Sequence, residues 1–302
     1  MDGLFISKPS DQLSEAKLQA GDIILFEGEA GDTLNWLIMH LSNSKYTHSA
    51  LVYEDGILAD AALSGLNIHH FSQKESGRPA CVMRLNGITD SEPLITNAAT
   101  LVNKKLPYDK PGLILAGLLL LQKKFPLHRK AQKWASLLLQ HAAKEISAAF
   151  AKGKHPVTCS QFVSSVYTMT GGDYALYFKN ADILSSSDKD GLIHKCQKLL
   201  GTKIPTNLAY GIEVSSSLDE ILSQLKDALN DTESVEEPVL PETVNAVKRF
   251  SCSLTRTLNS EDAIHKLAKG EELFITPGDL RQHCINLQFI CDVHIVRDNA
   301  IA

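Results

Sequence analysis

The sequence predicts an α+β fold, in which an antiparallel sheet packs on a helix that begins at a cysteine and further helices are inserted between these parts. Short apolar runs bounded by turn residues lie between residues 21 and 61 and again near residue 290, as expected for strands. The segments 110–153 and 201–270 instead repeat apolar residues at helical spacing.

The first strands carry two polar residues of interest. A Gly-Asp turn precedes an apolar run at 23–26, and the runs 45–53 and 57–61 are joined by Asp-Gly, a strong hairpin signal. His48 opens one strand of this hairpin and Asp60 lies on the other.

The register of the hairpin decides whether His48 and Asp60 can meet, because side chains alternate between the faces of a strand. A two-residue turn would point them to opposite faces. A three-residue turn at 54–56, with Gly56 left-handed, would place Ala50 opposite Asp60 and bring His48 within reach as a diagonal neighbour. A catalytic role for this pair therefore predicts the three-residue turn.

Cys159 stands at the predicted start of a helix. Pro156 and Thr158 are start signals, and the apolar face follows at helical spacing with Phe162, Val163, Val166 and Tyr167. The positive end of a helix dipole favours thiolate over thiol, and a histidine within reach would make that thiolate a nucleophile. The alternative is a small cysteine buried in the core.

The segment 113–150 predicts a helical hairpin. A run of leucines at 113–121 is too short to span a membrane, and a second helix aligns one apolar stripe of Trp134, Leu138, Ala142, Ile146 and Phe150. Residues 122–154 hold eight Lys or Arg and one Glu, a local net charge of +7. Peripheral membrane contact or a lid over the site is one interpretation. We favour an ordinary insertion with its stripe in the core.

The remaining third of the chain predicts a cap and a return to the sheet. A helix starts after Ser215-Ser216-Ser217, an acidic linker follows at 230–238, and two helices occupy 241–269. Strand-like runs at 273–275 and 289–296 close the chain. We therefore divide the chain into a catalytic domain at 1–200 with an insertion at 110–153, a helical insertion or cap at 201–270, and a return at 271–302.

Five segments in this order resemble a known family. They are GDIILF at 21–26, THSALVYEDGILADA at 47–61, YD at 108–109, TCSQFVSSVY at 158–167 and ITPGDL at 275–280. Together they resemble the circularly permuted papain-like cysteine hydrolases, and more narrowly the YiiX/YaeF-type branch of the NlpC superfamily, which is related to the lecithin–retinol acyltransferases. The resemblance covers about residues 20–110 and 155–185, with a short return near 272–296.

The resemblance implies a permuted papain-like fold and a catalytic triad. The histidine maps onto His48, the third polar residue onto Asp60, where Glu is more usual, and the nucleophile onto Cys159. Cys159 would attack a carbonyl, His48 would move the proton and Asp60 would orient the imidazole. We expect a thiol hydrolase of amides, that is, a peptidase or amidase. A lipid acyl hydrolase or acyltransferase is the alternative, and a non-catalytic binding module is the third.

Composition limits the partners. The 302 residues are 44% hydrophobic and 22% charged with a formal net charge of -5, which gives no reason to expect nucleic acid. The six cysteines form no Cys-x-x-Cys pair, so we expect neither a metal site nor a cofactor. The first residues lack a basic segment followed by a long apolar run. We therefore expect no signal peptide, reduced thiols and a cytoplasmic protein, with signal-independent secretion left open.

Overall fold

The computed structural model describes residues 5–7, 18–62, 65–70, 78–103, 111–124, 126–154, 156–179, 191–200, 216–231, 235 and 237–296. Across these residues, seven strands form one antiparallel sheet in the order β1-β7-β6-β2-β3-β4-β5. The strands are β1 (Phe5–Ser7), β2 (Ile23–Glu27), β3 (Tyr46–Glu54), β4 (Ile57–Ala62), β5 (Gly65–His70), β6 (Pro79–Leu85) and β7 (Leu287–Val296). The fold is therefore α+β, as predicted.

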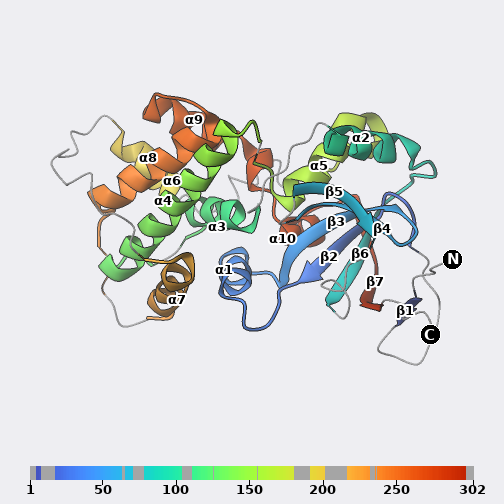
Figure 1. Ribbon diagram of the computed structural model, residues 1–302, viewed down its shortest axis with the longest axis horizontal. Helices are drawn as coiled ribbons and strands as arrows, with labels where there is room; N and C mark the ends of the chain where they lie inside the picture. Colours follow the sequence, from blue (N-terminus) through green and yellow to red (C-terminus); the bar gives the residue numbers. More distant parts are fainter. Residues whose placement is uncertain are drawn as a thin grey trace.

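Ten α-helices accompany the sheet in the described part of the chain (Figure 1). They are α1 (Thr33–Ser42), α2 (Glu92–Asn103), α3 (Pro111–Gln122), α4 (Arg129–Ala151), α5 (Cys159–Thr170), α6 (Leu192–Leu199), α7 (Leu218–Leu229), α8 (Pro241–Thr255), α9 (Ser260–Lys269) and α10 (Pro277–Gln282). Helices α1, α2, α6 and α10 are additions to the helices predicted from sequence.

The elements gather in two halves, with the sheet, α2 and α5 in one and most of the helices in the other (Figure 1). In the helical half, α4 packs against α7 and α8, and α8 packs against α9. Helix α1 contacts α3 and α7 in the helical half and β3 in the sheet, and so lies between the halves. The described parts of the segments 110–153 and 201–270, which are far apart in the sequence, thus build one helical body.

Helix α3 lies inside this body. Its residues from Leu113 to Leu121, apart from Gly117, are at most 1% exposed, so its leucines are core residues on every side. A Cβ atom at Gly117 would lie 2.7 Å from the ring of Phe250, and this close approach of α3 to α8 therefore requires glycine. In the described residues, no helix has both the length and the hydropathy to cross a membrane.

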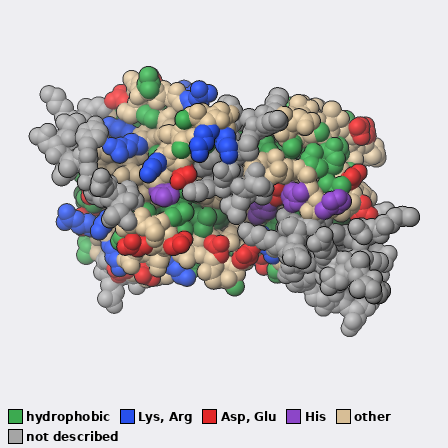
Figure 2. All heavy atoms as spheres, viewed as in Figure 1, with side chains coloured by type: hydrophobic (Ala, Val, Ile, Leu, Met, Phe, Trp, Pro, Cys, Tyr) green, Lys and Arg blue, Asp and Glu red, His purple; other side chains and the backbone are tan. Residues whose placement is uncertain are grey.

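Helix α4 has the arrangement of an ordinary insertion. The stripe from Trp134 to Ile146 is buried, while Arg129, Lys130, Lys133 and Lys144 are exposed. Figure 2 shows Lys and Arg side chains gathered on the helical half of the visible face. The apolar stripe from Trp134 to Ile146 therefore contributes to the core, and Phe150 at its end is partly buried.

The two faces of the sheet have separate cores. One face carries Ile23, Leu25 and Leu51 and joins the large cluster formed with α5 and the helical half. The other carries Ile24 and Phe26 and forms a smaller cluster with residues of β3, β4, β6 and β7. The pairing of β7 with β6 brings residues 287–296 into the same sheet as the strands that carry the candidate site, with β6 and β2 lying between β7 and β3.

One predicted strand is wrong. Residues 273–275 do not join the sheet, because Glu271–Phe274 form a 3₁₀ turn closed by the bond from Leu273 N–H to the Gly270 carbonyl. Phe274 and Ile275 are buried instead against the helices. The strand predicted at 289–296 is present as β7, which begins two residues earlier.

The predicted helix starts near 217 and 259 are confirmed. The Ser217 side chain caps α7 and that of Asn259 caps α9. Residues 108–109 of the resemblance, and residues 232–234 and 236 of the acidic linker, lie outside the described residues.

Candidate active site

Cys159 is the first residue of α5, as the start signals predict. Thr158 is the N-cap: its N–H donates to Gln161 Oε1 at 2.9 Å, and its Oγ1 accepts from Gln161 N–H at 3.2 Å. This reciprocal capping box fixes where the helix begins. It therefore holds the thiol at the positive end of the helix dipole.

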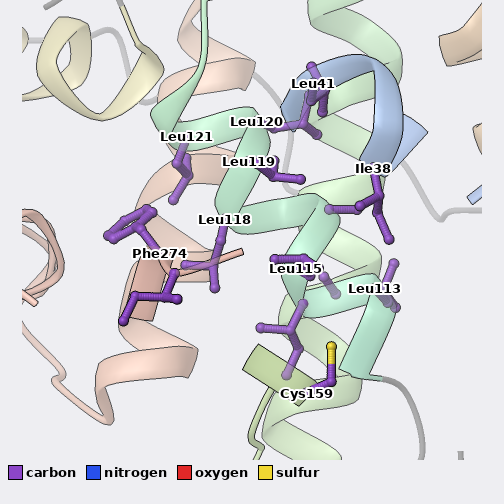
Figure 3. Close-up of a cluster of buried hydrophobic side chains, with 14 of the residues drawn as sticks. Ile38, Leu41, Leu113, Leu115, Leu118, Leu119, Leu120, Leu121, Cys159 and Phe274 are labelled. Carbon is purple, nitrogen blue, oxygen red and sulfur yellow. The ribbon is translucent and has the colours of Figure 1, made fainter. Parts of the chain in front are cut away.

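The thiol is almost covered. Cys159 is 4% exposed and belongs to the same apolar cluster as the leucines of α3. Figure 3 shows its side chain at the end of this cluster, beside Leu113 and Leu115. The surroundings of the sulfur on this side are thus aliphatic.

The hairpin that carries His48 and Asp60 has the register needed for contact. Ala50 pairs with Asp60, as predicted. The predicted three-residue turn is wrong in detail, since Glu54 pairs with Ile57 across a two-residue turn. A bulge between Val52 and Glu54 inserts the extra residue and restores the same register, so the outcome for the two side chains is unchanged.

His48 and Asp60 form a close pair. His48 Nε2 lies 2.7 Å from Asp60 Oδ2, and the Asp60 side chain is 0% exposed against 18% for His48. Because Nε2 donates to the carboxylate, Nδ1 is the ring nitrogen left for the Cys159 thiol, with which the His48 side chain is in hydrogen-bonding contact. The structure thus brings all three sequence-predicted residues together.

The electrostatics favour a charged pair. Burial opposes charge on His48, but its bonds to Asp60 and to the Cys159 sulfur outweigh this and raise its pKa to about 10. Burial likewise opposes the thiolate, yet the bond from His48 and those from Ser49 lower the pKa of Cys159 below its ordinary value. Thiolate and imidazolium therefore stabilise each other.

The other cysteines behave differently. Burial raises the pKa of Cys81 to about 11 and that of Cys196 to about 12, and it also raises the pKa of Cys252 and Cys284. Cys159 is buried like Cys81, Cys196 and Cys284, but it has a nearby imidazole. The contrast comes from this partner and not from solvent exposure.

Asp60 has a second partner that the sequence did not reveal. His69 on β5 places Nε2 3.1 Å from Asp60 Oδ1. Burial opposes the carboxylate charge, but the bonds from His48 and His69 overcome it and lower the pKa of Asp60 to about 2. The sequence shows alternating apolar and polar residues at 65–70, which is typical of a strand. This pattern does not place His69 beside Asp60 until the register between β4 and β5 is known.

Ser49 on β3 is a further polar neighbour of the thiol. It pairs with Leu25 and so faces the large cluster that contains Cys159. Its hydroxyl is 0% exposed, and no hydrogen-bond partner satisfies the usual geometry among the described residues. Both its backbone N–H and its hydroxyl favour the Cys159 thiolate.

Replacing Ser49 by alanine is expected to raise the pKa of Cys159 and to slow its alkylation near pH 6 by about three- to tenfold, because a hydroxyl that favours the thiolate is lost. Iodoacetamide labelling against pH, read by peptide mass, measures this. Ser251→Ala is the matched control, since Ser251 is a second buried hydroxyl without a partner in the described residues and lies on α8. Equal profiles for Ser49→Ala and wild type would contradict the role of this hydroxyl.

No group of three or more His, Cys, Asp or Glu side chains in the described residues is arranged to hold a metal ion. Two surface pockets lie away from the thiol. One, of about 330 Å³, contains the ion pair of Asp22 with Arg84, and the other, of about 470 Å³, lies beside Lys45 and Arg281. The groups gathered at Cys159 are its thiol, the imidazoles of His48 and His69 and the carboxylate of Asp60.

Comparison of the sequence with known protein families finds no match. A comparison with curated proteins finds no relative either.

Proposed function

We propose that the protein is a cysteine hydrolase that acts through an acyl-enzyme on Cys159, within a permuted papain-like, NlpC-type fold. The observation that carries the proposal is the chain of contacts from Cys159 to His48 to Asp60, with Nε2–Oδ2 at 2.7 Å. The order of the elements supports it as well, since the histidine strand precedes the cysteine helix.

The proposed reaction has two halves. The Cys159 thiolate attacks the substrate carbonyl carbon, and the carbonyl electrons move to oxygen, near the Cys159 N–H at the start of α5. Collapse of this adduct breaks the carbon–nitrogen bond as the His48 imidazolium protonates the departing amine. A thioester remains on Cys159.

Water completes the cycle. Neutral His48 takes a proton from water, the hydroxyl adds to the thioester carbon, and the thiolate leaves as the acid is released. Asp60 keeps Nε2 protonated and oriented throughout. An amide, as in a peptidase or amidase substrate, is the favoured class because protonation of a poor amine leaving group needs the imidazolium.

A second candidate is a lipid acyl hydrolase or acyltransferase. Its support is the apolar cluster of Leu113 and Leu115 beside the thiol, which suits an aliphatic acyl chain better than a polar peptide. The covalent chemistry is the same, with an alkoxide leaving group or an acceptor other than water.

The alkylation rates of the six cysteines against pH test the proposal, in wild type and in His48→Ala. We expect Cys159 to react about a hundredfold faster than the other five near pH 6, because the lowered pKa of its thiol gives it the larger thiolate fraction. That advantage should disappear in His48→Ala. An ordinary or unreactive Cys159 in both proteins would favour a binding module that keeps the fold without catalysis.

A further inference from the structure

His69 approaches Asp60 from the strand opposite to the one that carries His48. On β5 it pairs with Leu58, which places it on the same sheet face as Asp60. The Nε2 of His69 lies 3.1 Å from Asp60 Oδ1, and the Nε2 of His48 lies 2.7 Å from Asp60 Oδ2. Each oxygen of a fully buried carboxylate thus has its own imidazole.

The second nitrogen of His69 defines its protonation. Nδ1 lies 2.8 Å from the backbone carbonyl oxygen of His70, which can only accept a hydrogen bond. The ionised carboxylate of Asp60 is likewise an acceptor. Both bonds therefore form together only when both ring nitrogens carry hydrogen, that is, when His69 is an imidazolium.

With His69 charged, the site becomes a row of alternating charges. The row runs from the Cys159 thiolate to the His48 imidazolium, the Asp60 carboxylate and the His69 imidazolium. Its net charge is zero, whereas the first three groups alone carry one negative charge in a buried place, which is costly. The His69 side chain is 27% exposed, so the row ends at solvent.

We propose that His69 is a positioning residue of the Cys159 site, which holds the Asp60 carboxylate ionised and aimed at His48. This inference rests on the proposed function, because the orientation of Asp60 matters only if His48 activates the thiol. His69 contacts Asp60 and acts through this carboxylate.

Three variants test the proposal by alkylation of Cys159 against pH. His69→Leu removes both the donor and the charge, and we expect the rate near pH 6 to fall about tenfold or more. His69→Gln can still donate an amide N–H to Oδ1, and its rate should stay within about threefold of wild type. His70→Gln is the matched control, an exposed neighbour whose side chain should leave the rate unchanged.

A second measurement needs no variant. The ¹⁵N shifts of the His69 ring near pH 7 should report an imidazolium with both nitrogens protonated. A neutral ring without hydrogen on Nε2, which cannot donate to Asp60, would overturn the proposal, even if His69→Leu fails to fold.

The outcomes distinguish a failure of the role of His69 from a failure of the proposed function. A wild-type rate in His69→Leu, together with a strong loss in His48→Ala, overturns the role of His69 and leaves the proposed function standing. A Cys159 that is unreactive in wild type overturns the proposed function, and the positioning role of His69 with it.

Discussion

Replacing Asp60 by alanine is expected to slow the alkylation of Cys159 near pH 6 by about a hundredfold and to lower the free energy of unfolding by about 3–5 kcal/mol. The reason is that His48 and His69 both donate to this carboxylate, which is 0% exposed. Without it, His48 loses its counter-charge and the thiolate loses its charged partner.

The contribution of Asp60 and His48 to stability is expected to change with pH in a defined direction. The pKa of Asp60 is lowered to about 2, so its contribution is fully present above the unfolded pKa of about 4 and is lost as the pH falls from there towards 2. The pKa of His48 is raised to about 10, so its contribution is complete below the unfolded pKa of about 6.5 and is lost as the pH rises from there towards 10. Stability from this pair should therefore be greatest between about pH 4 and 6.5.

Thermal unfolding across pH measures this for Asp60→Ala and wild type. The difference between the two proteins should be largest in that window and shrink on either side of it. Asp173→Ala is the control, an exposed carboxylate in the turn after α5. A pH-independent difference, or an unchanged alkylation rate, would mean that Asp60 has no coupling to His48 and the thiol.

Replacing Gln132 by alanine is expected to lower the free energy of unfolding by about 3 kcal/mol or more and the melting temperature by about 5–10 °C. Gln132 on α4 is fully buried and joins separate parts of the helical half. Its amide donates to the carbonyls of Leu127 and Pro238, and its Oε1 accepts from the N–H of Leu240 at 2.8 Å and from Thr243 Oγ1 at 3.2 Å.

The cost arises because alanine would leave several buried polar groups without partners and would also open a cavity. Gln140→Ala on the same helix is the matched control, since Gln140 is only partly buried and should cost little. Calorimetry measures the melting temperatures of both variants. A melting temperature for Gln132→Ala equal to that of Gln140→Ala would show that this amide does not stabilise the contact of α4 with α8.

Much of the fold could be predicted because its signals are local. Thr158 and Gln161 cap α5 through bonds that span three residues, so the position of Cys159 follows from its neighbours in the chain. The Asp-Gly turn between β3 and β4 is equally local. Periodicity likewise revealed α3, α4 and the helices from α7 to α9.

The details of the site depended on longer-range contacts. The bulge between Val52 and Glu54 replaced the predicted three-residue turn. One extra residue in the strand or in the turn shifts the pairing by the same amount, so Asp60 pairs with Ala50 in either case. The composition of residues 273–275 is typical of a strand, but Phe274 packs against the helices and the segment forms the end of a 3₁₀ turn.

The sequence by itself determined the residue types and the local starts, that is, a cysteine at the head of a helix and a histidine and an aspartate on a hairpin. Only the tertiary structure placed His69 and Ser49 beside them, and joined 110–153 with 201–270 in one helical body. The physical reason is the sequence separation over which each interaction acts. Helix caps and turns depend on residues a few positions apart, whereas strand register and helix packing depend on the burial of apolar surface between segments far apart in the chain.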